Sequence, residues 1–373
     1  MRIIKYLAVA LAVVIPLSGI MSMDGCAFFK QFGETPKGLD LERVQASEHY
    51  VEGSFVNLED TPMFTDGSGY FGVFVEMLFT SVERAVPTAA LPVVKTDIKA
   101  LPPEKELVVW LGHSAYYIQL GGYRILVDPV FSRYASPLPF VNKAFNGTTV
   151  YSASDFPEID YLLITHDHWD HLDYSTVLAL KPYVKKVICG LGVGSHFRYW
   201  GYPATAVQEA DWDTTLHVAD NFLIHVLTAR HRSGRFIARS PTLWVAFALQ
   251  SPERKLFISG DSGYGKHFAE IGERFGGFDL AILDSGQYND KWRHAHMNPE
   301  DAAQAAEDLR ALALLPAHVA RFSLARHSWD EPLIRTNAIC RDKPYRLLTP
   351  VIGEVVSLND PDQHFSRWWE GIE

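Results

Sequence analysis

Short apolar runs, separated by polar or glycine-containing breaks, dominate the chain from Leu107 onward. The segment "LVVWLGHSAYYIQLGGYRILVDPVF" holds three β-rich runs with Gly-His-Ser and Gly-Gly between them, so it predicts a meander of hairpins. Further strands are expected in "YLLIT", "KVICG", "FLIHVLTA", "TLWVAFAL", "KLFISG", "DLAILD" and "ALLPA".

Helical segments alternate with several of these strands, namely "YSTVLALK", "KHFAEIGERF" and "NPEDAAQAAEDLRAL". The last one begins with Asn298 as N-cap, Pro299 at the first helical position and acidic residues in the first turn, which is typical of a helix start. Near-continuously apolar strands with helices between them predict an α/β (α+β) fold, in which sheets pack face to face under helices. We assign this domain to residues 105–373.

The first 26 residues have a different pattern. Arg2 and Lys5 precede the apolar run "YLAVALAVVIPLSGIM", which has roughly the length of a signal peptide. A membrane-spanning helix needs about 20 apolar residues, and Pro16 interrupts this run. Positive charge before the run predicts an exported, periplasmic protein, or one that stays membrane-anchored and faces outward. A protein with an uncleaved anchor that faces the cytoplasm is the alternative. "MDGC" resembles a lipoprotein cleavage site, so a lipidated Cys26 is an alternative.

Residues 27–104 are expected to form an irregular extension that packs on the main domain. Their one strongly apolar segment is "GYFGVFVEMLFT", from Gly69 to Thr80. A helix packed on the main body is the first interpretation of this segment. A surface that contacts lipid or an acyl substrate is the second.

Composition narrows the classes of function. The chain has 373 residues, 47% of them hydrophobic and 21% charged, as in an ordinary globular protein. A net charge of −10 without a basic stripe argues against nucleic acid as a partner. The three cysteines exclude a dense disulfide framework, and the absence of a CxxC motif argues against a cysteine zinc site. No part of the sequence indicates an oligomeric state.

The segment "ITHDHWDHLD" carries the strongest chemical signal. His166, His168, Asp170 and His171 form an H-x-H-x-D-H pattern directly after a predicted strand. Imidazole nitrogens and carboxylate oxygens suit zinc and similar divalent ions. A turn after the strand can direct the first two histidines to one ion, and Asp170 and His171 to a second ion.

Two metal ions need more ligands than one turn can supply. His231, Asp261 and His318 each follow a predicted strand, and glycines flank Asp261. Any one of them alone would be an ordinary loop residue. Together with the histidine cluster, they are the expected completion of a dinuclear site.

The stretches around these residues resemble the metallo-β-lactamase-fold hydrolases, and most of all the branch that contains the N-acylphosphatidylethanolamine-hydrolysing phospholipase D. The resemblance covers about residues 107–335 in the family's order, and includes "ITHDHWDHLDY", "ARHRSGR", "ISGDSGYGKHFAEIGERFGGFDLAIL", "HMNPEDA" and "LLPAHVARFSLARHSWDEP". It implies a four-layer αββα sandwich with a dinuclear metal site at one edge.

The family's ligand scheme implies two sets of three ligands and one bridging carboxylate: His166, His168 and His231 for the first metal, Asp170, His171 and His318 for the second, and Asp261 for both. Two zinc ions are expected, because diiron oxidoreductases of this fold carry glutamate where this chain has His168. Iron and manganese are the alternatives.

Two such ions would activate water for attack on phosphorus or on a carbonyl carbon. Asp170 is the candidate to orient that water or to accept its proton. His113 and His327 are candidates for the pocket wall, with packed positions behind it as the alternative. The resemblance implies a phosphodiester of an N-acylated phospholipid as substrate and a nearby membrane surface. A lactonase or esterase for a small anionic ester is the alternative, and a non-catalytic metal-binding scaffold is the third hypothesis.

Overall fold

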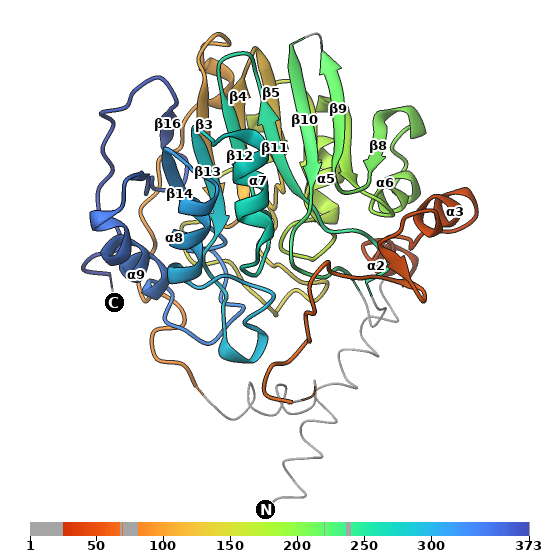
Figure 1. Cartoon of the computed structure of the whole chain (residues 1–373), viewed down its shortest axis with the longest axis horizontal. Coiled ribbons are helices and arrows are strands. Elements are labelled where there is room, and N and C mark those ends of the chain that lie inside the picture. Colours follow the sequence, from red (N-terminus) through yellow and green to blue (C-terminus); the bar gives the residue numbers. More distant parts are fainter. Residues whose placement is uncertain (1–24, 68, 70–80, 220, 236–239, 373) are drawn as a thin grey trace, which may run out of the picture.

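Two seven-stranded sheets form the centre of the molecule (Figure 1). The computed structural model describes residues 25–67, 69, 81–219, 221–235 and 240–372. The first sheet has the order β15 (Arg346–Leu347), β14 (Ala313–Ala317), β13 (Leu280–Asp284), β12 (Lys255–Ile258), β11 (Ala246–Gln250), β10 (Phe222–Leu227) and β9 (Thr214–Ala219). The second has the order β16 (Val355–Ser357), β3 (Leu107–Gly112), β4 (Ala115–Leu120), β5 (Tyr123–Val127), β6 (Ile159–Ile164), β7 (Val184–Gly190) and β8 (Val207–Ala210).

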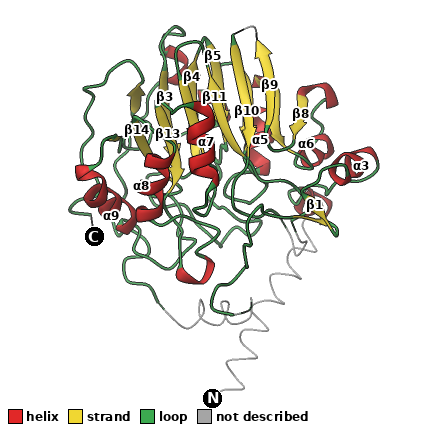
Figure 2. Cartoon of the chain, in the orientation of Figure 1, coloured by secondary structure: helices red, strands yellow, loops and turns green. Residues whose placement is uncertain are grey.

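Each sheet is antiparallel on one side and parallel on the other. β9 to β12 pair in antiparallel fashion, and β12 to β15 are parallel. Likewise, β16, β3, β4 and β5 are antiparallel, and β5 to β8 are parallel. Carboxyl ends of parallel neighbours share one edge of a sheet, which is where sites of α/β proteins form. Figure 2 shows the longer loops gathered at one edge of the sandwich.

Helices cover the outer faces of both sheets. α8 contacts β13 and β14, and α7 packs on α8, whereas buried side chains of α5 and α6 pack in the outer core of the second sheet. The helices are α2 (Gly25–Lys30), α3 (Leu39–Gln45), α5 (Tyr174–Leu180), α6 (Gly194–Tyr199), α7 (His267–Phe275), α8 (Pro299–Asp308) and α9 (Glu331–Ile339). Short 3-10 turns lie at Ile98–Ala100, Ala153–Asp155, Lys181–Tyr183, Ala204–Ala206, Asp290–Trp292 and Cys340–Asp342. The predicted α/β class and layered sandwich are confirmed.

Alternate residues of the central strands face two different apolar cores. In β3, Val108 and Trp110 belong to the larger core, which includes the inner faces of both sheets. Leu107, Val109 and Leu111 belong to the core under α5 and α6. All six residues of β3 are therefore buried, which explains why the sequence shows a continuous apolar run rather than alternation.

The extension before residue 105 is packed on the sandwich. Val44, Phe55 and Leu91 are buried in the larger core. This region contains α3 and a small hairpin of β1 (Tyr50–Val51) and β2 (Ser54–Phe55), where the sequence predicted only irregular structure. Val44 is the buried side chain of α3. This helix therefore lacks the repeated apolar positions, three or four residues apart, from which a helix is predicted.

Most predicted elements are present, with one informative exception. The segment "TLWVAFAL" forms a strand only from Ala246 onward. Before that point, the N–H groups of Leu243 and Val245 donate to the carbonyls of Leu191 and Thr165, which lie beyond the ends of strands in the other sheet. The apolar segment 70–80 and the leader 1–24 lie outside the described residues. Within the part that is described, no helix is long and apolar enough to cross a membrane.

Candidate metal centre

The ligand-type residues predicted from the sequence converge at one edge of the sandwich. The histidine cluster follows β6 of the second sheet, whereas His231, Asp261 and His318 follow β10, β12 and β14 of the first sheet. The two sheets come very close here. A Cβ atom on Gly260, which has a φ of +57°, would lie 2.8 Å from the Cβ of Thr165. Glycine therefore permits the approach that brings Asp261 to the histidines.

The first set comprises His166, His168, His231 and Asp261. The Nε2 atoms of His166 and His231 lie 2.9 Å and 3.3 Å from Nδ1 of His168. Oδ2 of Asp261 lies 3.7 Å from Nε2 of both His166 and His231. One ligand atom from each of the four residues lies within 4.8 Å of the others, so this set could hold a metal ion.

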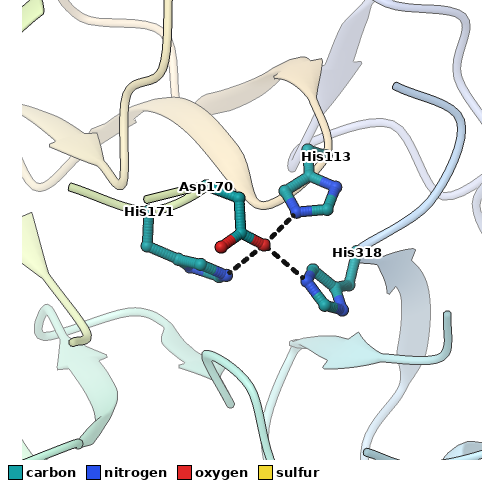
Figure 3. A group of neighbouring side chains, drawn as sticks. All are labelled: His113, Asp170, His171 and His318. Carbon is teal, nitrogen blue, oxygen red and sulfur yellow. Dashed lines mark hydrogen bonds and ion pairs between the residues drawn. The ribbon is translucent and has the colours of Figure 1, made fainter. Parts of the chain in front are cut away.

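The second set surrounds Asp170 (Figure 3). Its Oδ2 lies 2.8 Å from Nε2 of His113, 3.1 Å from Nε2 of His318 and 3.5 Å from Nε2 of His171. Asp261 also reaches this set, at 3.1 Å from Nε2 of His171 and 3.4 Å from Nε2 of His318. Asp261 therefore contacts both sets, in the position that a bridging carboxylate would need.

Asp128 fixes the orientation of two rings without contacting the shared space. Nδ1 of His171 donates to its carboxylate at 2.8 Å, and the Thr165 hydroxyl donates to it at 2.5 Å. Because the hydroxyl proton is used in that hydrogen bond, the Thr165 oxygen accepts from Nδ1 of His166 at 3.0 Å. Nε2 of His166 therefore carries a lone pair that points into the site. Burial opposes protonation of His171, but the carboxylates of Asp261 and Asp170 outweigh it and raise the pKa of His171 well above 6.5, so a cation that binds there would displace the proton on its Nε2.

His231 is oriented in the same way, since its Nδ1 donates to the carbonyl of Ala295 at 2.9 Å. Nε2 of His171 and Oδ1 of Asp261 are buried and face each other as an ion pair at 3.1 Å. Histidine rings that direct one nitrogen at a shared space, while a carboxylate, hydroxyl or carbonyl group holds the other nitrogen, are typical of metal ligands. This donor set therefore fits divalent cations.

Burial and local charge determine the protonation of the rings. Burial lowers the pKa of His166 and of His231 well below 6.5, so both are neutral at pH 7, as metal ligands must be. Burial also opposes protonation of His318, but the carboxylates of Asp261 and Asp284 outweigh it and raise the pKa of His318 to about 10. A cation that binds there would compete with this proton.

His113 and His327, the two candidates for the pocket wall, lie behind it. Nε2 of His113 contacts Asp170, and burial lowers the pKa of His113 to about 3, so the neutral ring donates this hydrogen bond. Nε2 of His327 accepts from the backbone N–H of Gln287 at 3.0 Å, and its Nδ1 contacts the carbonyl of Ser328 at 2.8 Å. Both rings thus have structural partners, and neither one lines the cavity.

Three titratable residues next to the site were not singled out from the sequence. Asp128 and Asp284 stand at the ends of β5 and β13, so the strand-end signal that identified Asp261 applies to them as well. His296 lies in the turn before α8, where no such signal exists. Its Nδ1 contacts Oδ2 of Asp284 at 2.9 Å, and its ring lines the cavity.

A cavity of about 610 Å³ lies over these residues. Its floor is made by His168, Asp170, His231, Asp261, His296 and His318. Residues 55–64 of the extension form one wall. Among the described residues that line it, Arg232 is the one arginine or lysine, and its charge helps burial to lower the pKa of His168 to about 4.

Comparison with known proteins agrees with this geometry. Residues 123–319, more than half of the chain, match the Beta-lactamase superfamily domain. The chain belongs to this family. An uncharacterised family relative from Mycobacterium tuberculosis is 35% identical over 340 residues, which cover 89% of this chain and 91% of that protein.

Two further similarities bear on the fold and on the chemistry. The N-acyl-phosphatidylethanolamine-hydrolyzing phospholipase D 1 of Caenorhabditis elegans is 28% identical over 250 residues, or 63% of this chain and 70% of that protein. The solved structure of Igni18, a metallo hydrolase from Ignicoccus hospitalis, superposes with a TM-score of 0.52 at 20% identity, covering 68% of this chain and 97% of that one. The predicted resemblance is confirmed: this β-lactamase superfamily chain is a member of a metal-dependent hydrolase family.

Proposed function

We propose that this chain is a dinuclear metal-dependent hydrolase that cleaves a phosphodiester with water, and that its substrate is an N-acylated phospholipid. The convergence of histidine rings from both sheets around the shared carboxylate of Asp261 carries this proposal. His166, His168 and His231 would hold the first ion, Asp170, His171 and His318 the second, and Asp261 both. Zinc is the ion that we propose, because histidine and carboxylate side chains are its common ligands.

Two bound divalent cations would lower the pKa of a water molecule and neutralise the charge that develops on the attacked group. Asp170 lines the cavity, and His113 holds its carboxylate from behind, so it can orient the attacking water by accepting a hydrogen bond. His296 also lines the cavity, and Asp284 holds its Nδ1 at 2.9 Å. We assign to His296 the transfer of a proton to the leaving group, since a positioned imidazole is the most common group for that task.

The walls of the cavity support an amphiphilic anion as substrate. Val56, Leu58 and Met63 are exposed apolar side chains on the wall formed by the extension, and they could contact an acyl chain. The guanidinium of Arg232 could pair with a phosphodiester near the ligands. The phospholipase similarity points to the same class of substrate, although any anionic ester could use Arg232.

Aromatic residues beside the histidine cluster support work at a lipid surface. The ring of Phe32 packs against that of Trp169, which lies between His168 and Asp170, at a centroid distance of 5.1 Å. The ring of Phe29 lies 6.2 Å from that of Phe32 and is 64% exposed, so a large apolar side chain next to this pair is in contact with solvent. We therefore propose that the protein is exported or anchored at a membrane and binds lipid through this side.

The decisive experiment measures release of phosphatidic acid from vesicles that contain N-acylphosphatidylethanolamine, with and without a chelator. We expect turnover that the chelator abolishes and that added zinc restores. A panel of lactones and β-lactams run in parallel tests the alternative. Turnover of lactones alone would replace the phospholipase proposal with a lactonase, and a fully metal-loaded protein that is inactive on every substrate would favour a binding scaffold.

A further inference from the structure

Residue Asn57 connects the extension to the backbone of a metal-ligand candidate that is 174 positions away in the sequence. Its Nδ2 donates to the carbonyl of His231 at 2.8 Å, and its Oδ1 accepts from the backbone N–H of His231 at 3.0 Å. The two bonds determine the orientation of the amide, because a flipped amide would place donor against donor and acceptor against acceptor.

The position of His231 explains why such a contact is needed. β10 ends at Leu227, so His231 is beyond the sheet and has no ladder partner. Its imidazole is held at Nδ1 by Ala295, which fixes the rotation of the ring but leaves the main chain to be held by something else. The amide of Asn57 supplies the pair of hydrogen bonds that a neighbouring strand would otherwise make.

The residue before His231 strengthens the same attachment. Arg230 donates from Nε to the hydroxyl of Thr61 at 2.9 Å and from a terminal nitrogen to the carbonyl of Asp60 at 2.6 Å. Its other terminal nitrogen donates to the carbonyl of Tyr264, three residues after Asp261, at 2.9 Å. The extension is thus tied to the loops that carry two of the ligand candidates.

We infer that Asn57 is a positioning residue for the metal centre: it holds the main chain of His231 so that Nε2 stays directed at the first ion. This inference rests on the proposed function only in taking His231 as a ligand. It makes the extension, which lies outside the β-lactamase superfamily match, a working part of the metal centre.

The test compares two variants of the full-length protein by zinc titration and by the absorption spectrum of the cobalt-substituted form. Asn57→Ala removes both hydrogen bonds, and we expect zinc affinity at one site to fall by about 10- to 100-fold, the usual effect of losing an outer-sphere partner. The cobalt bands should shift, and excess zinc should restore most of the lost activity.

Asn57→Asp separates positioning from simple electrostatics. It keeps the size of the side chain and the acceptor for the N–H of His231, but it sets a carboxylate oxygen against the His231 carbonyl. We expect weaker zinc binding even though negative charge has been added near a cation site. Unchanged or tighter binding in a folded Asn57→Asp protein would overturn the inference. This variant decides the question if Asn57→Ala does not fold, as judged by circular dichroism.

Two further variants make the outcomes distinguishable. Asn146→Ala makes the same chemical change at an exposed position outside the cavity lining, and it should leave metal binding and activity unchanged. His231→Ala should lose one metal ion. If it retains both, the proposed ligand set is wrong. If it loses one while both Asn57 variants bind zinc normally, only the role of Asn57 is wrong.

Discussion

At the scale of single residues, the candidate metal centre depends as much on the outer nitrogens of its histidines as on the inner ones. The carboxylate of Asp128 orients two of these rings. His171 is hydrogen-bonded to it directly, and His166 is connected to it through the hydroxyl of Thr165. Such partners select the tautomer that a ligand needs, and they hold the ring in place.

The ligand assignment itself is tested at His168 and Asp261. His168→Ala and Asp261→Ala should each abolish turnover and lower the amount of bound metal, because Asp261 contacts both sets and His168 lies between two other rings. Metal content by atomic emission and activity on the same preparation are the measurements. Full activity with stoichiometric metal in either variant would contradict the assignment.

His296 is expected to behave differently from the ligands. His296→Gln should reduce kcat by about 100-fold or more, as expected for loss of a proton-transfer group, while the two metal ions remain bound. Steady-state kinetics combined with metal analysis distinguish the roles. Because His296 also lies within reach of Asp261 and His318, loss of a metal ion in this variant would make it a ligand instead.

The ligand candidates could be found from the sequence because each has a chemically distinctive side chain at the end of an apolar run. The supporting partners Asp128 and Asp284 share that signal, but other partners could not be found in this way. Asn57 and Ala295 act on His231 through ordinary amide and carbonyl groups, and nothing in their local sequence marks them. The sequence offers His113 and His327 as candidates for the pocket wall, but the fold places both rings behind it.

At the scale of elements, the loop after β6 is held by a buried arginine. Arg235 donates to the carbonyls of Asp167 and Leu172 at 2.9 Å and 2.6 Å, and its guanidinium lies 3.8 Å from the centre of the Trp169 ring. Burial lowers the pKa of Arg235 to about 10, so the group remains charged at pH 7. These contacts hold both ends of the histidine cluster.

Arg235→Met should therefore lower the free energy of unfolding by roughly 1.5–3 kcal/mol, because it removes hydrogen bonds from a charged donor to buried carbonyls. Chemical denaturation measures the change, and zinc affinity should fall with it. Arg341→Met, at an exposed position in a short turn, is the matched control. Equal stability of the two variants would show that the loop does not need this arginine.

Strands were easier to predict than helices, for a reason that the structure makes clear. A strand buried on both faces is an unbroken apolar run, as in β3, β13 and β14. α6 has six residues and α9 nine, and their buried positions do not form the long periodic stripe that identifies a helix. The apolar character of the segment before β11 predicts a strand, but its N–H groups at Leu243 and Val245 donate to carbonyls just beyond the ends of two strands of the other sheet.

At the scale of the whole molecule, the candidate ligands belong to both sheets, so a bound ion would link them. Zinc that binds only the folded protein should raise its stability by about 2.7 kcal/mol at a free concentration 100 times its dissociation constant. Thermal unfolding in a zinc series should therefore show a rising Tm, and the rise should disappear in Asp261→Ala. A Tm that is independent of zinc in the unmodified chain would mean that no such link forms.

Because the candidate ligands belong to both sheets, their order in the chain determines when the set is complete during synthesis. His166 leaves the ribosome early, but β14 and the residue that follows it are made near the end of the chain, after nearly all of the first sheet. The full set of candidate ligands therefore exists only after His318 has been synthesised, when nearly all of the sandwich has already been made. Loading of both sites is consequently an event that follows translation of almost the whole chain.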